Sequence, residues 1–112
     1  MTHTLPAPIR VGEEPTCWQV IEPDGTVHED RWPTDLTEDG LLTMYRTMSL
    51  VRCLDERMQT LQRQGRITFY GAATGQEAAV IGSGFATKKP DWILPALREG
   101  GVALLRGFPL SD

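Results

Sequence analysis

The part of the sequence best suited to chemistry surrounds Arg98, in the string DWILPALREGGVALLRG. The apolar run 92–94 is consistent with a buried strand, and residues 97–106 are typical of a helix. Backbone N–H groups at a helix start carry partial positive charge, and a guanidinium forks onto phosphate oxygens. Arg98, at this predicted strand-to-helix junction, is therefore a candidate phosphate-binding residue. The alternative for a lone arginine is an ion pair with Glu99 or Asp91.

A second candidate region is the glycine-flanked, aromatic turn from Phe69 to Gly75. Its glycines allow the backbone to approach a ligand closely, and Phe69 is placed to line an apolar pocket. Composition alone favours the alternative interpretation, in which Phe69 anchors the turn onto the core.

Other reactive side chains do not form a site. His3 and His28 lie in irregular segments without metal-ligating neighbours. We therefore predict that neither histidine is catalytic and that neither binds a metal. Cys17 and Cys53 fit no metal or disulfide spacing and are interpreted as free thiols. The string at 82–87 lacks the last glycine and the preceding strand of a dinucleotide fingerprint, so that function is rejected.

A long helix is predicted to position these residues, from Asp35 to a stop at Gly65. Asp35 with Glu38 resembles a capping pair, and Thr37 is a competing N-cap. Apolar residues recur at helical spacing, whereas charged residues, Asp55 among them, fall mostly on the other side. The apolar positions are Leu41, Met44, Tyr45, Met48, Val51, Leu54, Met58 and Leu61. Core packing is the favoured reason for this methionine-rich stripe, and a partner-binding face is the alternative.

A second helix is predicted over 76–87, opened by Thr74 or Gly75. Glu77 in its first turn complements the helix dipole, which is a structural role. Gly82 and Gly84 are costly inside a helix, so we expect another backbone to approach closely there.

The prolines near the N-terminus predict an extended arm over residues 1–34. A short hairpin is expected within the arm, from Trp18 through the turn Pro23-Asp24-Gly25 to Val27. Residues 35–112 then form the second region. Its order of helix, strand and helix fits one piece of a doubly wound α/β sheet.

Length, net charge and hydropathy exclude some classes of function. The chain has 112 residues and a net charge of −4, with no basic stripe, so nucleic-acid binding is not expected. No apolar run approaches the roughly 18 residues of a membrane span. We therefore expect a cytoplasmic protein. One small domain has too little chain to cover the apolar face of the long helix, which indicates that a partner subunit covers part of it.

Four strings together, YRTMSLVRCLDERM, QRQGRITFY, GQEAAVIGSGFA and DWILPALREGGVALLRG, resemble a known family. They are similar to the N-terminal part of the alpha subunit of thiamine-diphosphate-dependent 2-oxo acid dehydrogenases. That class includes the decarboxylating components of the pyruvate, branched-chain 2-oxo acid and acetoin dehydrogenase complexes. The resemblance spans residues 36–110, and the GRITFY form of the turn leans toward branched-chain and related bacterial pyruvate enzymes.

The resemblance implies a heterotetramer of two alpha and two beta subunits, with thiamine diphosphate and magnesium at the alpha–beta contact. It implies that the intact enzyme decarboxylates a 2-oxo acid oxidatively and passes the acyl group to the lipoyl domain of an acyltransferase. The residue matching Arg98 contacts the diphosphate, and the turn matching Phe69 and Tyr70 lies at the cofactor and substrate channel. Leu97 stands where the family usually has tyrosine, so one hydroxyl contact to phosphate is lost.

The chain also lacks two sets of residues that the family uses for magnesium binding and catalysis. Nothing in it matches the Gly-Asp-Gly segment and downstream asparagine that bind magnesium, or the later histidines near the reacting carbon. We therefore expect the 112 residues alone to be inactive. The alternative function is an inactive remnant that acts only as a subunit-interaction module.

Overall fold

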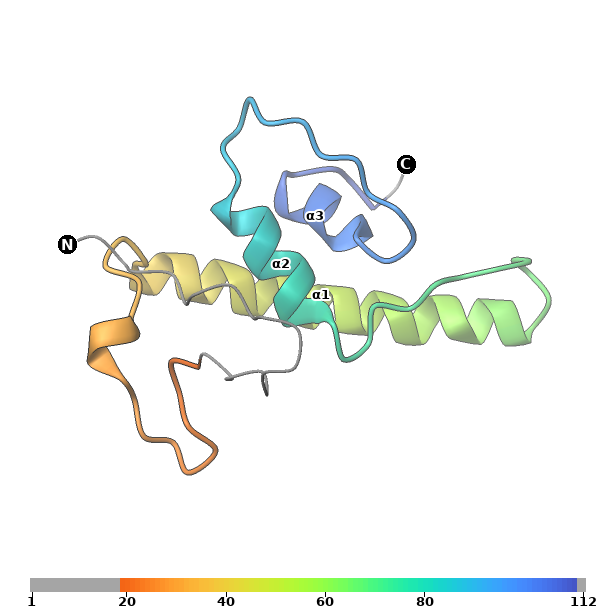
Figure 1. The fold of residues 1–112 in the computed structure, drawn as a ribbon. Coiled ribbons are helices and arrows are strands. Elements are labelled where there is room, and N and C mark those ends of the chain that lie inside the picture. Colours follow the sequence, from red (N-terminus) through yellow and green to blue (C-terminus); the bar gives the residue numbers. More distant parts are fainter. Residues whose placement is uncertain (1–18, 111–112) are drawn as a thin grey trace, which may run out of the picture. The chain divides into compact units, whose positions relative to one another are not determined.

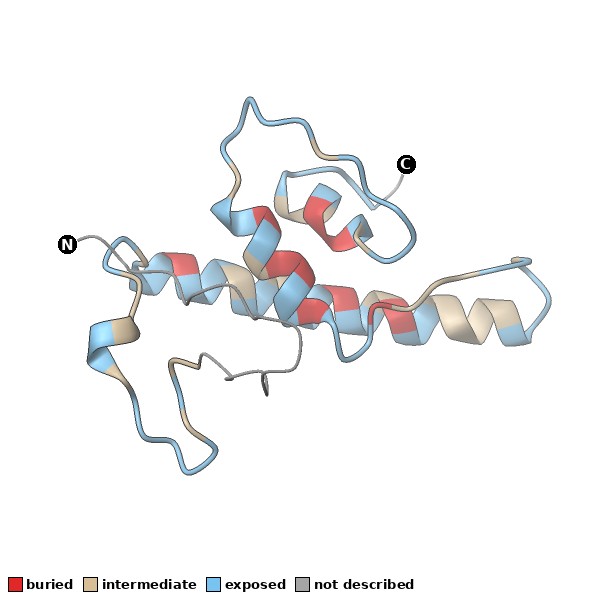
Figure 2. Ribbon diagram, viewed as in Figure 1, coloured by how far each residue is buried: buried red, intermediate tan, exposed pale blue. Residues whose placement is uncertain are grey.

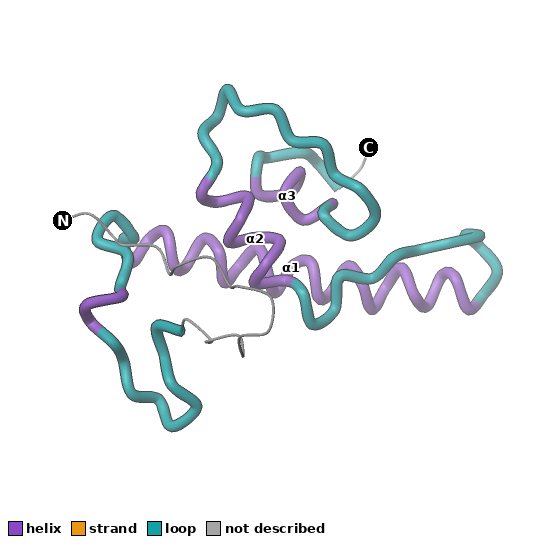
Figure 3. The backbone as a smooth tube through the Cα atoms, viewed as in Figure 1, coloured by secondary structure: helices purple, strands orange, loops and turns teal. Residues whose placement is uncertain are grey.

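The computed structural model describes residues 19–110. By its internal contacts the chain divides into two units, Met1–Leu36 and Thr37–Asp112. The described residues form helices and loops but no strand (Figures 1 and 3). The elements are the short 3-10 helix η1 (Glu29–Arg31) and the α-helices α1 (Glu38–Arg63), α2 (Glu77–Ala86) and α3 (Gly100–Leu105).

The first unit contains a tight turn in the segment where we predicted a hairpin. Gly25 has a left-handed φ of 89°, which glycine adopts without steric cost. Its N–H donates to the carbonyl oxygen of Glu22 at 2.9 Å. Ile21 and Val27 form one antiparallel bridge across this turn. Trp18, where the predicted hairpin begins, lies outside the described residues.

Helix α1 is capped at its start by Thr37 and not by Asp35, the residue at which we predicted the helix to begin. The Oγ1 atom of Thr37 accepts a hydrogen bond from the N–H of Gly40 at 3.1 Å, which satisfies one of the free donors of the first turn. The helix ends at Arg63, and Gly65 just beyond it has a left-handed φ of 70°. The N–H of Gly65 donates to the carbonyl oxygen of Gln62 at 2.9 Å, as in other glycine-terminated helices.

Helices α2 and α3 pack against α1 and against each other, and most of the buried segments lie where these helices meet (Figure 2). Gly101 permits the close approach of α3. A Cβ atom there would lie 3.0 Å from side-chain atoms of both Ile81 and Val51. The buried apolar core consists of Val51, Ala73, Val80, Ile81 and Val102.

The two glycines predicted to admit another backbone differ in their surroundings. A Cβ at Gly84 would lie 2.9 Å from a methyl group of Val102, whereas a Cβ at Gly82 would meet nothing within 4 Å. The close neighbour at Gly84 is therefore a side chain of α3, not a backbone. The prediction is wrong in that respect.

The methionine-rich stripe of α1 is core only in part. Met44 and Met48 are partly buried against the core cluster, while Leu41 and Tyr45 are exposed. Within residues 19–110, no helix combines the length and the apolar character that a membrane crossing requires.

The predicted strand at residues 92–94 is not formed, so the described part of the chain is helical rather than α/β. The side chains of Trp92 and Leu94 are 93% and 90% exposed. A strand needs a neighbouring strand to pair its N–H and C=O groups, and no described residue offers one there. The last predicted helix is also shorter than expected, because it begins at Gly100 and not at Leu97.

Candidate functional site

The second unit contains a pocket of about 330 Å³ that brings most of the predicted site residues together. Its walls come from helix α1, from the turn after Phe69 and from the chain beyond Ala96. The walls are apolar except for Asp55, Tyr70 and Arg98. The pocket is therefore a candidate site for a ligand with an apolar part and an anionic group near the arginine.

Arg98 lies at the edge of this pocket, in a bend before α3 and not directly after a strand. Its Nη1 atom donates to the carbonyl oxygen of Ala72. The alternative ion pair is not formed within residues 19–110, because the Glu99 carboxylate instead accepts from the N–H groups of Ala96 and Arg98, at 2.9 and 3.1 Å. These N–H groups, that of Arg98 first, lower the pKa of Glu99. Asp91 caps the preceding turn.

Leu97 packs onto the backbone of the turn. A Cβ atom at Gly71 would lie 3.0 Å from the Cγ atom of Leu97 and 3.3 Å from its carbonyl oxygen. A side chain at position 71 would therefore require Leu97 to shift by a few tenths of an ångström. The glycine that we predicted to admit a ligand thus admits Leu97, and the pair 97–98 is docked on the turn through two contacts.

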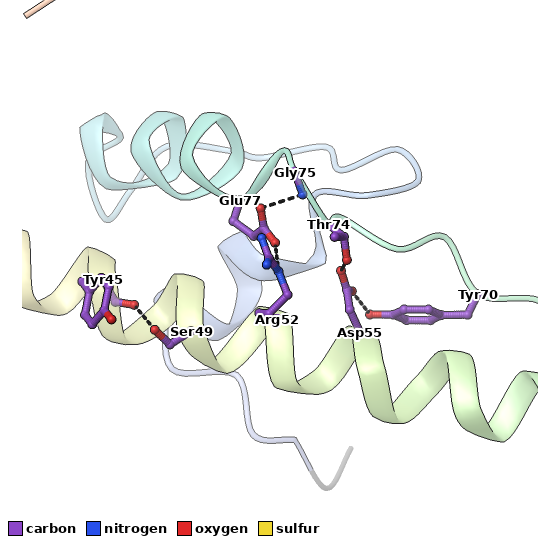
Figure 4. Close-up of polar contacts among 8 residues, drawn as sticks. All are labelled: Tyr45, Ser49, Arg52, Asp55, Tyr70, Thr74, Gly75 and Glu77. Atoms are coloured by element: carbon purple, nitrogen blue, oxygen red, sulfur yellow. Dashed lines mark hydrogen bonds and ion pairs between the residues drawn. The ribbon is translucent and has the colours of Figure 1, made fainter. Parts of the chain in front are cut away.

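The other side of the turn is held by a buried carboxylate that the sequence analysis placed on the solvent side. Asp55 of α1 has an exposed fraction of 0%. Its Oδ1 atom accepts from the hydroxyl of Tyr70 at 2.7 Å, and its Oδ2 atom accepts from the hydroxyl of Thr74 at 2.8 Å (Figure 4). Burial, and then the neighbouring Asp55, raises the pKa of Tyr70 to about 12, so this phenol stays protonated and acts as a donor.

A second carboxylate fixes the start of α2. Glu77 accepts from the Nε atom of Arg52 at 2.5 Å and from the N–H of Gly75 at 2.8 Å (Figure 4). The bond from Arg52, followed by backbone N–H groups, lowers the pKa of Glu77 to about 2. The N-cap of α2 is Gln76, and neither Thr74 nor Gly75 is the cap. The Thr74 hydroxyl is bonded to Asp55, and Gly75 contributes its N–H to Glu77.

Phe69 is the predicted site residue that the structure separates from the others. Tyr70, Leu97 and Arg98 line the pocket, whereas Phe69 does not line it and is 64% exposed. The interpretation of Phe69 as a core anchor is therefore wrong, and its place at a cofactor site stays a prediction.

Asp55 is the residue that sequence reasoning missed, although a signal for it was present. It falls four residues after Val51 and one after Leu54, and Met58 follows it, so it lies on the apolar stripe of the helix. A carboxylate on an apolar stripe calls for a hydrogen-bonding partner.

Metal-ligating side chains do not gather in the described part of the chain. No group of three or more His, Cys, Asp or Glu residues within residues 19–110 is arranged to hold an ion. His28 contacts Glu22 at 2.6 Å in the first unit, and Cys53 is an exposed free thiol. His3 and Cys17 lie outside the described residues.

Comparison with known proteins gives consistent matches. Residues 45–112 match the family described as the dehydrogenase E1 component. The 3-methyl-2-oxobutanoate dehydrogenase subunit alpha of Mycobacterium tuberculosis is 44% identical over 92 residues, covering 81% of this chain and 25% of the relative. The pyruvate dehydrogenase E1 component subunit alpha of Staphylococcus epidermidis is 37% identical over 94 residues, covering 84% of this chain and 25% of the relative. No solved structure matches the chain significantly.

The fold and the pocket define a helical unit with one arginine at the edge of an apolar pocket. The comparisons define the family. The chain belongs to the dehydrogenase E1 component family, and the relatives that it matches are alpha subunits. It spans about a quarter of the length of these relatives.

Proposed function

We propose that the chain is the N-terminal portion of the alpha subunit of a thiamine-diphosphate-dependent 2-oxo acid dehydrogenase. In the intact enzyme it takes part in the oxidative decarboxylation of a 2-oxo acid, with transfer of the acyl group to a lipoyl domain. Family membership supports this function, as do the names of the relatives, which refer to 3-methyl-2-oxobutanoate and to pyruvate.

The observation that carries the proposal is the position of Arg98. Its guanidinium is exposed, lies at the pocket edge and uses one nitrogen for Ala72. Within residues 19–110 its other donors have no hydrogen-bond partner, so they are free to bind phosphate oxygens. Leu97 beside it supplies an apolar contact, and the ring of Tyr70 borders the same pocket. In this proposal Phe69 lines the approach to the site once another subunit covers it.

The residues present fit one part of a diphosphate site. Arg98 suits a phosphate group, but the hydroxyl of Tyr70 is engaged by Asp55 and Leu97 has no donor. Thiamine diphosphate supplies the electron sink for decarboxylation when it is bound. No cluster of three or more His, Cys, Asp or Glu residues within residues 19–110 could hold a metal ion, so the proposal assigns the magnesium ligands and the reacting groups to residues outside this part of the chain.

The proposal includes a heterotetramer with a second alpha subunit and two beta subunits, and an acyltransferase that supplies the lipoyl domain. It also includes a doubly wound α/β sheet in the intact subunit. The unpaired backbone of residues 92–94 supports a sheet, because free N–H and C=O groups in an extended segment are available to a neighbouring strand.

Binding of thiamine diphosphate, measured by calorimetry on the complete alpha subunit assembled with its beta subunit, tests this function. We expect magnesium-dependent binding that Arg98→Met weakens roughly ten- to a hundredfold, since a charged hydrogen bond contributes about 1.5–3 kcal/mol. Arg46→Met, at an exposed arginine elsewhere on α1, should bind like the wild type. Equal affinity of the wild type and Arg98→Met would overturn the role of Arg98. The 112 residues alone should show no measurable binding.

A further inference from the structure

Asp55 is a buried carboxylate that makes no direct ion pair within residues 19–110. Neither ion pair within residues 19–110 involves it, and its exposed fraction is 0%. Burying a carboxylate is costly unless its oxygens are hydrogen-bonded. Both oxygens of Asp55 accept from hydroxyl groups, at 2.7 Å from Tyr70 and 2.8 Å from Thr74.

These two donors bracket one short segment of the turn. Tyr70 and Thr74 stand at the ends of residues 70–74, so Asp55 attaches both ends of the segment to α1 (Figure 4). Hydrogen bonds at both ends of the segment restrict the positions that the atoms between them can take. Those atoms include the carbonyl oxygen of Ala72.

The middle of the same segment holds the arginine. The carbonyl oxygen of Ala72 accepts from the guanidinium of Arg98, and the backbone of Gly71 contacts Leu97. A continuous set of contacts thus leads from Asp55 on α1 through the turn to Arg98. Glu77 holds the last residue of the turn, Gly75, and Asp55 holds the segment 70–74 that contains Ala72.

From this geometry we infer that Asp55 is a positioning residue for Arg98: by holding residues 70–74 on α1, it aims the guanidinium at a phosphate group in the pocket. The inference rests on the proposed function, because the phosphate is that of the proposed cofactor. Asp55 lies in the pocket wall, but both of its oxygens already accept from hydroxyl groups of the turn. It acts through Tyr70, Thr74 and the Ala72 carbonyl group.

The Thr74 side chain offers a matched pair of variants. Thr74→Val keeps the shape of the side chain and removes the donor, whereas Thr74→Ser keeps the donor. In the complete alpha subunit assembled with its beta subunit, we expect Thr74→Val to weaken thiamine diphosphate binding about fivefold and Asp55→Asn about tenfold, as expected for the loss of hydrogen bonds to a buried charge. Thr74→Ser should bind like the wild type.

A double-mutant cycle separates positioning from general stability. If Asp55 acts through Arg98, Asp55→Asn should cause no further loss of affinity in an Arg98→Met background. A purely structural role predicts the same fold loss in both backgrounds. Val80→Ala, in the core but outside the pocket lining, provides a variant of reduced stability that should keep wild-type affinity.

Hydrogen exchange supplies a readout that does not depend on the cofactor. Asp55→Asn and Thr74→Val should speed exchange in peptides covering residues 67–76 and also in those covering 95–100. Val80→Ala should speed exchange in 77–86 without affecting 95–100. Unchanged exchange at 95–100 in Asp55→Asn would overturn the inference.

The two proposals fail in different ways. If the wild-type assembly does not bind thiamine diphosphate, the proposed function fails and the cofactor role of Asp55 fails with it. If the wild type binds and Asp55→Asn binds equally well, or if its loss is unchanged in the Arg98→Met background, the positioning role alone is wrong.

Discussion

At the scale of single residues, Glu77 makes the fold sensitive to acid. Its pKa is lowered from 4.5 to about 2, first by the hydrogen bond from Arg52 and then by backbone N–H groups. A carboxyl group with a lower pKa in the folded state stabilises the fold above its ordinary pKa, and this stabilisation is lost as the pH falls through the folded value. Thermal melting should therefore show a falling melting temperature as the pH drops from about 4.5 toward 2.

Two variants isolate this effect from the other acids. Glu77→Gln should melt at a lower temperature than the wild type at neutral pH and should show a flatter dependence below pH 4.5. Arg52→Gln should also make the melting temperature less dependent on pH below 4.5, because it removes the main cause of the lowered pKa of Glu77. Parallel pH profiles of Glu77→Gln and the wild type would show that another group governs the acid response.

Residue type and sequence neighbourhood predict part of the pocket lining, but they do not establish what the lining residues do. Tyr70, Leu97 and Arg98 were chosen from motifs and line one pocket, although their cofactor role stays a prediction. Asp55 was missed because charge suggested solvent, and the sequence alone does not show that Tyr70 and Thr74 would supply donors. Those donors come from a separate loop, so their meeting with α1 depends on tertiary packing.

At the scale of elements, the two glycines inside α2 give opposite expectations for the same substitution. Gly82→Ala should stabilise the protein by about 0.5–1 kcal/mol, because alanine is the better helix former and its Cβ atom would meet nothing within 4 Å. Gly84→Ala should destabilise it by about 1 kcal/mol, since overpacking of about 1–3 kcal/mol exceeds the gain in helix propensity. Chemical denaturation of both variants measures the difference.

The steric cause can be checked with Val102, the neighbour at 2.9 Å from a Cβ at position 84. In a Val102→Ala background the methyl groups are absent, so Gly84→Ala should no longer be destabilising. A loss of equal size in both backgrounds would mean that the contact between α2 and α3 is not the reason.

An element is predictable from the sequence when neighbouring residues specify it, and less so when it depends on residues far away in the chain. Helix α1 has local signals at both ends, and it ends at Arg63 just before Gly65, as predicted. Its start differs only because Thr37 and not Asp35 is the cap. The segment 92–94 has the composition of a strand, but pairing partners are not local. Composition alone did not determine whether they are present.

At the scale of the whole molecule, large apolar side chains remain in water near the end of the second unit. Trp92 and Leu94 are almost fully exposed, and a pocket of about 520 Å³ lies beside them, with Trp92, Val102 and Phe108 in its lining. Exposed apolar groups of this size are typical of surfaces that another chain or segment covers. The heterotetramer of the proposed function would supply such a cover.

Trp92 provides a direct measurement of this covering. A Trp18→Phe/Trp32→Phe variant leaves Trp92 as the last of the three tryptophans in these 112 residues. The difference spectrum against the same variant with Trp92→Phe isolates the Trp92 signal from that of the rest of the assembly. The emission of Trp92 should shift to shorter wavelength, and acrylamide should quench it less, when the alpha and beta subunits assemble, since the indole then leaves water. Trp92→Ala should weaken the assembly by about 2 kcal/mol, the scale of an aromatic anchor in an interface, and Trp92→Phe should weaken it less. Unchanged emission in a complex shown by sedimentation to be assembled would mean that the subunit contact lies elsewhere and that the apolar surface around Trp92 is covered by neither subunit.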